Sequence, residues 1–143
     1  MIVYAEDIMT TSLATLAPDN TCQEALLLLA QKKITGAPVL NSQGDLIGVI
    51  SCTDLNTLQL HHAESGSPKG NPLALLVKDV MTQNVITAPP QTSVQQLAQD
   101  MIDHNIHRII ILNPTTQKPV GIVSTYDILK YFSYGSTYKT AVA

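Results

Sequence analysis

A short sequence motif occurs twice in this chain, and its repetition constrains the fold more than any other feature. The first copy, GVISCTDL, spans residues 48–55, and the second copy, GIVSTYDI, spans residues 121–128. Each copy combines a glycine, a short β-branched strand and a Ser-x-x-Asp corner that opens an amphipathic helix. We therefore expect two similar half-domains, with the function in the cleft between them.

The repetition extends well beyond this motif. Asp-Ile-Met-Thr at residues 7–10 recurs as Asp-Val-Met-Thr at residues 79–82, an offset of 79 − 7 = 72 residues. One additional residue in the second copy raises the offset to 127 − 54 = 73 at the two aspartates, Asp54 and Asp127. Two units are too few for a solenoid. We expect a pair related by pseudo-twofold symmetry, in which each unit buries its apolar face against the other.

Each unit is predicted to have the element order β-α-β-β-α. In the first unit Thr21 and Glu24 form a capping box for a helix to about residue 33, and strands over 38–40 and 46–50 flank a turn. Thr53 or Asp54 is expected to cap a second helix to about His61. The second unit has a helix capped by Thr92 or Ser93, and its later elements are predicted as strands over 108–112 and 120–124 and a helix over 126–132.

These elements define the expected domain organisation. The first repeat covers residues 1–61 and the second covers 77–132. The linker, 62–76, contains Gly, Ser, Pro and Asn, which argue against regular structure there. The tail, 133–143, is polar and small and is expected to fray.

Composition excludes several classes of function. The net charge is −3 and no basic run occurs, so a nucleic-acid surface is not expected. No apolar run reaches membrane-spanning length, and Cys22 and Cys52 have no metal or redox spacing. We expect a soluble, cytoplasmic protein with buried, reduced cysteines. Because we find no nucleophile–base set, Walker loop, zinc motif or paired acids, we expect neither an enzyme nor a metal site.

Four motifs together resemble a known family. They are the Asp-x-Met-Thr openings, the Thr-x-x-Pro approach to each first helix, the Gly-Ala-Pro-Val strand at 36–39, and both Gly-x-x-Ser-x-x-Asp corners. Each repeat resembles a cystathionine β-synthase (CBS) domain, and the pair resembles a Bateman module in a stand-alone CBS-domain protein. The resemblance covers nearly the whole chain except the linker and the tail, and it implies a mixed α/β (α+β) fold.

The resemblance also implies a function. CBS pairs commonly act as regulatory modules, not enzymes, and bind AMP, ADP, ATP or S-adenosylmethionine in two clefts between the repeats. No obligatory cofactor is implied. They commonly form homodimers, flat discs of four repeats, and pass ligand binding to an effector protein that the sequence does not identify. The alternative is a structural dimerisation module whose clefts are vestigial.

A nucleoside site needs acceptors for the ribose diol and donors for the phosphate. Asp54 and Asp127 suit the diol, because a carboxylate at a helix start accepts charge-assisted hydrogen bonds. The hydroxyl groups at 51, 53, 124 and 125 lie beside the same helix N-termini, where a phosphate is favoured. The alternative is that the two aspartates serve only as N-caps.

His107 and Arg108 are a second indication, because a His-Arg pair at this strand entry contacts phosphate in the family. Arg offers a fixed fork of donors that matches phosphate oxygens. The alternative is a solvated loop before a strand. The first repeat has the uncharged pair Thr35-Gly36 at this position, and Pro38 stands where the second repeat has Ile110.

In the family each cleft takes its aspartate corner from one repeat and its base-binding strand from the other. The first cleft would therefore contain Ser51, Thr53, Asp54, Ile86, Thr87, His107 and Arg108. The second would contain Ala14, Thr15, Thr35, Gly36, Ser124, Thr125, Tyr126 and Asp127, where Tyr126 either stacks on a base or covers the cleft. We expect the first cleft to be the stronger phosphate site, because it alone has a fixed cation. The second would prefer a less charged ligand or stay empty.

Overall fold

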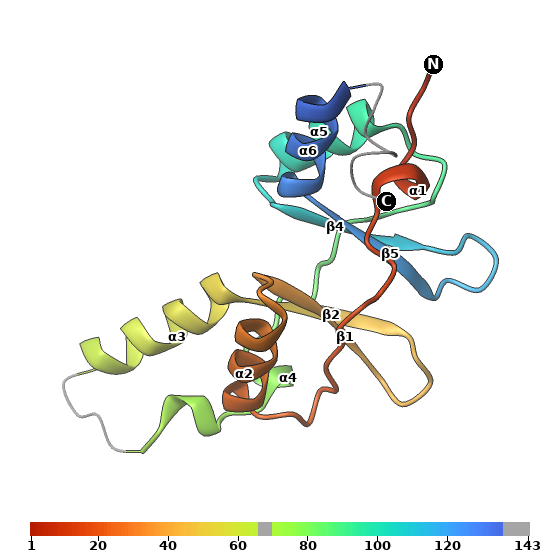
Figure 1. Cartoon of the computed structure of the whole chain (residues 1–143). Helices are drawn as coiled ribbons and strands as arrows, with labels where there is room; N and C mark the ends of the chain where they lie inside the picture. Colours follow the sequence, from red (N-terminus) through yellow and green to blue (C-terminus); the bar gives the residue numbers. More distant parts are fainter. Residues whose placement is uncertain (66–69, 136–143) are drawn as a thin grey trace. The chain divides into compact units, whose positions relative to one another are not determined.

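The computed structural model describes residues 1–65 and 70–135, which form short helices and two small sheets (Figure 1). The chain divides into two compact units. The first-repeat unit is Ala14–Val85, and the second-repeat unit combines Met1–Leu13 with the chain from Ile86 onward. The predicted mixed α/β class is therefore confirmed.

The first-repeat unit is built on an antiparallel hairpin. Strand β1 (Gly36–Leu40) pairs with β2 (Leu46–Ser51), with Pro38 opposite Val49. Helix α2 (Cys22–Lys32) precedes the hairpin and α3 (Cys52–Glu64) follows it directly. The unit is completed by a 3₁₀ turn, η1, at Pro72–Ala74 and by the single-turn helix α4 at Val77–Val80.

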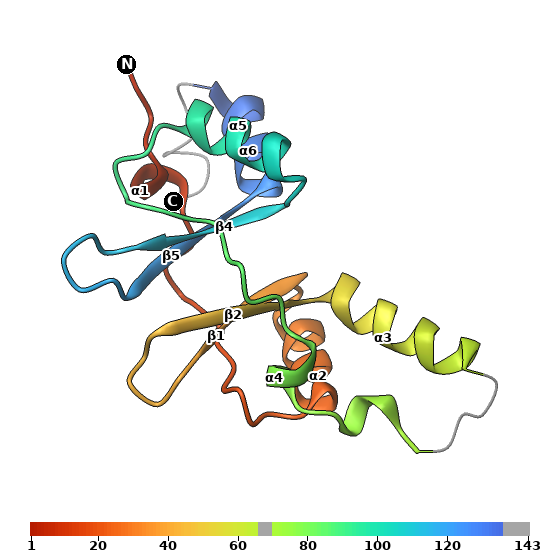
Figure 2. The same cartoon turned by 180° about the vertical axis from the view of Figure 1, so that it is seen from behind.

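The second-repeat unit repeats this plan around a three-stranded sheet of order β3-β4-β5. The strands are β3 (Thr87–Ala88), β4 (Arg108–Leu112) and β5 (Pro119–Ser124), with β3 parallel and β5 antiparallel to β4. The helices are α1 (Ala5–Ile8), α5 (Val94–His104) and α6 (Thr125–Tyr134), and α5 and α6 lie side by side in Figures 1 and 2.

The first predicted strand of the β-α-β-β-α order is present in the second-repeat unit only. In the first-repeat unit it is reduced to an isolated parallel bridge between Leu16 and Val39. The Leu16 amide bonds to the Pro38 carbonyl at 3.0 Å, and the Leu40 amide bonds to the Leu16 carbonyl at 2.9 Å. The next donor along this edge would be the nitrogen of Pro38, which carries no hydrogen, so the ladder ends there.

Several predicted boundaries were wrong at the ends of helices. Helix α3 continues to Glu64, so part of the predicted linker is helical. The Pro72–Ala74 turn is also regular structure inside that linker. Helix α6 extends into the predicted tail as far as Tyr134, while residues 66–69 and 136–143 lie outside the described residues.

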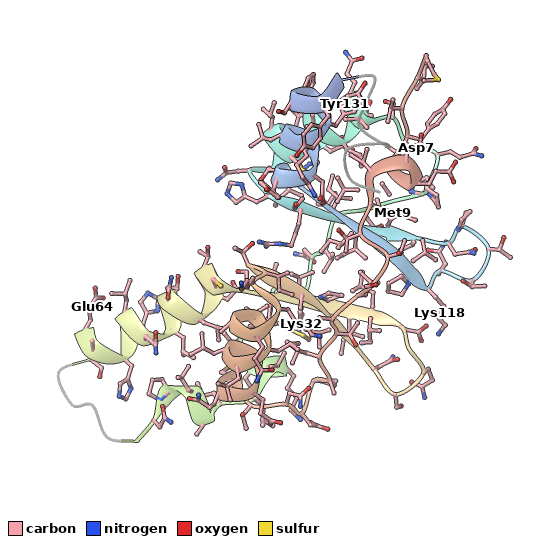
Figure 3. All side chains as sticks on the ribbon, viewed as in Figure 1. Asp7, Met9, Lys32, Glu64, Lys118 and Tyr131 are labelled. Carbon is pink, nitrogen blue, oxygen red and sulfur yellow. The ribbon has the colours of Figure 1, made fainter. Side chains whose placement is uncertain are left out.

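The Asp-x-Met-Thr segment at the start of each repeat packs against the other repeat. Thr10 pairs with Ile122, and Thr82 pairs with Val49. Met9 lies between α1 and β5 (Figure 3), where its sulfur covers Gly121, and Met81 covers Gly48 in the same way. The compact units therefore differ from the contiguous repeats, because each unit takes this opening segment from the sequence of the other repeat.

Each unit has its own apolar core, built mainly from aliphatic side chains. In the first-repeat unit the buried residues are Leu16, Cys22, Ala25, Leu29, Ala37, Val39, Ile50, Leu55, Leu73 and Val77. In the second-repeat unit they are Ala5, Ile8, Ala88, Val94, Leu97, Met101, Ile109, Ile111, Val123 and Ile128. These cores fix the two strand-to-helix corners that follow β2 and β5.

The two cysteines differ in burial. Cys22 lies at the start of α2 with no exposed surface, while Cys52 is only half-buried at the start of α3. Burial raises the pKa of the Cys22 thiol, and the nearby Asp79 carboxylate adds to the effect. The expectation of buried cysteines is thus confirmed for Cys22 but not fully for Cys52.

Adding a methyl group at Gly121 should test the methionine contact. A Cβ there would overlap the sulfur and Cγ of Met9, so Gly121→Ala should lower the free energy of unfolding by about 1–3 kcal/mol. In a Met9→Ala background the loss should be smaller by at least about 0.5 kcal/mol, measured by urea denaturation as a double-mutant cycle. Equal losses in both backgrounds would contradict the contact.

Gly48→Ala with Met81→Ala provides the matched comparison. A Cβ at Gly48 would lie 2.5 Å from the Met81 sulfur and also 3.0 Å from the backbone oxygen of Thr82. The Thr82 backbone oxygen remains after truncation of Met81, and the Met9 Cβ, 3.1 Å from the position of a Cβ at Gly121, remains after truncation of Met9. We therefore expect a partial rescue of similar size at both glycines.

The reactivity of the two thiols should follow their burial. Because only a thiolate reacts rapidly, and burial disfavours the Cys22 thiolate, iodoacetamide at neutral pH should alkylate Cys52 in the folded protein and leave Cys22 unmodified. Peptide mapping by mass spectrometry checks this, with alkylation in denaturant as the control that labels both. Rapid native labelling of Cys22 would contradict the described core.

Candidate functional site

The candidate site is built on two strand-to-helix corners with the same internal geometry. The first corner, Ser51–Asp54, joins β2 to α3. The Ser51 hydroxyl accepts a hydrogen bond from the Asp54 amide at 3.1 Å, and Asp54 Oδ2 accepts from the Ser51 amide and hydroxyl, both at 2.9 Å. This reciprocal capping box satisfies amides that the first turn of a helix leaves without partners.

The second corner, Ser124–Asp127, joins β5 to α6 and has the same bonds. The Asp127 amide donates to the Ser124 hydroxyl at 3.2 Å, and Asp127 Oδ2 accepts from the Ser124 amide at 2.8 Å and the Ser124 hydroxyl at 3.0 Å. Each N-cap is therefore the serine. The prediction that Thr53 or Asp54 caps the helix was wrong, because the aspartate side chain reaches back to the serine from the third helical position. Ser93 is the N-cap of α5, in agreement with one of the two residues, Thr92 or Ser93, that were predicted for this cap.

The second carboxylate oxygen, Oδ1, distinguishes the two corners. Thr82 Oγ1 lies 3.5 Å from Asp54 Oδ1, at the long limit for a hydrogen bond. Lys130 Nζ lies 3.5 Å from Asp127 Oδ1, and Asp127 is only 5% exposed, whereas Asp54 is half-buried. The two aspartates thus form the same capping bonds through Oδ2. Their Oδ1 atoms, which could bind a ligand, have different neighbours: a hydroxyl at Asp54 and an ammonium at Asp127.

The entry of one strand lies directly beside each corner within the same unit. In the second-repeat unit the Thr125 amide bonds to the His107 carbonyl at 2.9 Å, and Arg108 is opposite Ser124 in the β4–β5 register. In the first-repeat unit the Cys52 amide bonds to the Thr35 carbonyl at 2.9 Å, and Gly36 is opposite Ser51. Hydrogen bonding of the sheet therefore places the predicted phosphate pair at the second corner of its own unit.

The remaining predicted residues are distributed over both units. Ile86 packs against the core beside β3, and Thr87 is exposed on β3 opposite Ile110. Ala14 and Thr15 directly precede the Leu16 bridge, while Thr53 is exposed on the first turn of α3. Both predicted clefts combine members of the two units, so their composition stays a prediction.

Sequence reasoning missed two residues that contact the aspartates. Lys130 follows Asp127 by three positions, a helical spacing at which oppositely charged side chains meet. The Lys130 ammonium also lies 5.1 Å from the centroid of the Tyr126 ring. Thr82 belongs to the second Asp-x-Met-Thr motif, and its contact with Asp54 depends on the exchange of opening segments, which the sequence does not show.

Residues 1–65 and 70–135 contain no group of three or more His, Cys, Asp or Glu side chains placed to hold a metal ion. Among the helices described, none is both long and apolar enough to cross a membrane.

Comparisons with known proteins agree with the repeat and with the fold. A family model for the CBS domain matches residues 5–60 and again 77–134. The CBS domain-containing protein YhcV of Bacillus subtilis is 32% identical, over 86% of this chain and 81% of its own. Uncharacterized protein MJ1426 of Methanocaldococcus jannaschii is 29% identical, over 90% of each chain. An inosine-5'-monophosphate dehydrogenase of Halobacterium salinarum is 30% identical, and the match spans 24% of its length.

Two solved structures are similar and contain adenosyl ligands. One is the CBS domain pair of protein MJ0100 in complex with 5'-methylthioadenosine and S-adenosyl-L-methionine, with a TM-score of 0.82 and 25% identity over 93% of this chain and 98% of that one. The other is CBSX2 in complex with AMP, with a TM-score of 0.76 and 25% identity over 91% and 96%. With both repeats matched by the family model and the fold shared with CBS domain pairs, the chain belongs to the CBS domain family and carries two copies of the domain.

Proposed function

We propose that this chain is a regulatory module that recognises an adenosyl ligand, AMP, ADP, ATP or S-adenosylmethionine, by the carboxylate of an aspartate corner. The observation that carries the proposal is the duplicated capping box, which fixes a carboxylate at each helix N-terminus and leaves its Oδ1 outside the cap. Adenosyl ligands in two similar CBS pairs support the choice of ligand.

The chemistry of the corners fits a ribose diol. An ionised carboxylate has about four acceptor positions, and the two cap bonds at Oδ2 leave those of Oδ1. Each charge-assisted hydrogen bond from a ribose hydroxyl would stabilise the complex by about 1.5–3 kcal/mol. Because the cap fixes the carboxylate before the ligand arrives, little side-chain freedom is lost on binding.

Phosphate recognition is assigned to His107 and Arg108 in this proposal. Arg108 is the first residue of β4, so the strand register holds its backbone in place. Its guanidinium would bind phosphate oxygens in a bidentate manner. At the corresponding strand entry of the first-repeat unit, Thr35-Gly36 offers no charged side chain to a phosphate.

Signalling requires that the ligand bind two states of the module with different affinity. The proposed outputs are a change of conformation or of oligomer, received by an effector protein of unknown identity. Cys22 and Cys52 are free thiols, which fits a reducing cytoplasm. This chain matches only about a quarter of the length of the inosine-5'-monophosphate dehydrogenase. A match to so small a part of an enzyme fits a regulatory role without catalysis.

Ligand-induced stabilisation tests the proposal. A ligand at about a hundred times its dissociation constant should add about 2.7 kcal/mol and raise the melting temperature by several degrees. The panel is AMP, ADP, ATP and S-adenosylmethionine, each with and without Mg²⁺. Asp54→Asn should weaken binding at least about tenfold, because it removes one charged acceptor.

Asp19→Asn is the matched control, because Asp19 is an exposed carboxylate that pairs with Lys78 at 3.2 Å. It removes the same charge and should leave the affinity unchanged. Arg108→Ala should weaken AMP binding and leave adenosine binding unaffected. No shift with any ligand of the panel would contradict the proposed function.

A second candidate function is a dimerisation module, and the outer face of α6 favours it. Tyr126, Leu129 and Phe132 lie at successive turns of α6 and are 67%, 65% and 70% exposed. The corresponding residues of α3, at an offset of 73, are the polar Thr53, Asn56 and Gln59. Phe132 is the only phenylalanine of the chain, and four of the six aromatic residues lie on α6.

The size of this face matches the apolar part of a dimer interface. The three side chains expose roughly 400 Å² in total, given that an aromatic residue can bury about 150–250 Å². A standard interface buries about 800 Å² per partner, of which about 60% is apolar. Ile102, 73% exposed on the adjacent α5, adds to the apolar area of this pair of helices.

Replacing the α6 residues by those of α3 tests this candidate. The double variant Leu129→Asn, Phe132→Gln removes most of the apolar face without touching the core, and it should convert a wild-type dimer into a monomer. Sedimentation equilibrium measures the change. Leu60→Asn, at an exposed apolar position of α3, is the control and should leave the dimer intact. A wild-type monomer, or a double variant that remains dimeric, would contradict it.

A further inference from the structure

Lys130 contacts two residues of the second corner that were predicted to hold a ligand. Its Nζ lies 3.5 Å from Asp127 Oδ1 and 5.1 Å from the centroid of the Tyr126 ring. The Asp127 side chain is 7% exposed and that of Lys130 is 30% exposed, so the pair is only partly screened by water. An ammonium beside both a carboxylate and an aromatic face is held by two attractive interactions.

The contact leaves Asp127 with both oxygens engaged. Oδ2 belongs to the capping box, and Oδ1 faces the Lys130 ammonium. A ribose hydroxyl that approaches Oδ1 must displace or share this charged partner. A neutral hydroxyl is the weaker donor, and a buried carboxylate that is separated from its paired cation is destabilised.

The first corner lacks this competitor. The residue that corresponds to Lys130, at 130 − 73 = 57, is Thr57, which is exposed and too short to reach Asp54 in the manner of a lysine. Asp54 Oδ1 has instead the long contact with the Thr82 hydroxyl at 3.5 Å. A ribose hydroxyl can replace another neutral hydroxyl there without separating an ion pair.

We propose that Lys130 is a specificity-determining residue that closes Asp127 to a ribose diol, so that a nucleoside is accepted at Asp54 and excluded at Asp127. This inference rests on the proposed function, because it assumes that the aspartate corners recognise ribose. The two corners would then differ in ligand affinity because of Lys130 itself. This adds to the difference in charge between the strand entries, where His107-Arg108 corresponds to Thr35-Gly36.

The test isolates the second corner and uses adenosine as the probe, because adenosine has the diol but no phosphate that would itself respond to the loss of a lysine. In an Asp54→Ala background the first corner is disabled. Adding Lys130→Thr, which installs the residue of the first repeat, should strengthen adenosine binding at least about tenfold, or about 1.4 kcal/mol. Isothermal titration calorimetry measures the affinity. In the otherwise wild-type chain Lys130→Thr should add a second equivalent of bound adenosine.

Three controls separate the proposed mechanism from a structural effect. 2'-Deoxyadenosine lacks one hydroxyl of the diol and should gain much less than adenosine from Lys130→Thr. Lys130→Arg keeps a cation at this position and should retain the wild-type stoichiometry. Lys78→Thr removes another lysine–aspartate pair, with Asp19, and should leave adenosine binding unchanged.

The outcomes distinguish this inference from the proposed function. Suppose that the wild type binds adenosine through Asp54. If Lys130→Thr then leaves the affinity for adenosine unchanged, or raises the affinities for adenosine and 2'-deoxyadenosine equally, the role of Lys130 is overturned and the proposed function stands. If only the chains with Lys130→Thr bind, the first corner is not the site and the role of Lys130 holds. If no variant binds adenosine, the role of Lys130 is overturned, while the proposed function is decided separately by the panel of AMP, ADP, ATP and S-adenosylmethionine.

Discussion

The reciprocal bond between a serine and the aspartate three residues later is the constraint on which the described structure depends. It ends a strand and begins a helix within a single residue, because Ser51 and Ser124 are the last residues of their strands and also the N-caps of α3 and α6. A strand can turn into a helix this abruptly only if the free amides of the first turn find acceptors at once. The same bond fixes the carboxylate that the proposed function uses.

The exchange of opening segments gives each corner a second support. Met9 and Met81 cover Gly121 and Gly48, which lie three residues before the capping serines, and the close contact explains why neither position carries a side chain. Thr82 comes from the same exchanged segment and lies near Asp54. A residue far away in the sequence thus contacts the candidate ligand position, so the opening segment and the corner form one structural element.

The two repeats share a backbone plan but differ in the chemistry of their side chains. Pro38 shortens the sheet of the first-repeat unit, while Ile110 allows a third strand in the second-repeat unit. Thr57 and Lys130 give the two aspartates different neighbours. Thr53, Asn56 and Gln59 make the outer face of α3 polar where that of α6 is apolar. Both repeats therefore keep the Ser-x-x-Asp corner, whereas the side chains next to the two aspartates and on the outer faces of α3 and α6 differ.

The sequence by itself determined the repeat, the helices α2, α3, α5 and α6, the two antiparallel strand pairs and the two corners, because strand patterns, caps and turns are local properties of neighbouring residues. It also determined that Ser-x-x-Asp opens each second helix, although local pattern left the choice of cap open. Only the tertiary structure decided which segments share a core, where Met9 and Met81 pack, and that Thr82 contacts Asp54. These contacts depend on the path of the backbone and on side-chain direction, which a one-dimensional pattern does not specify.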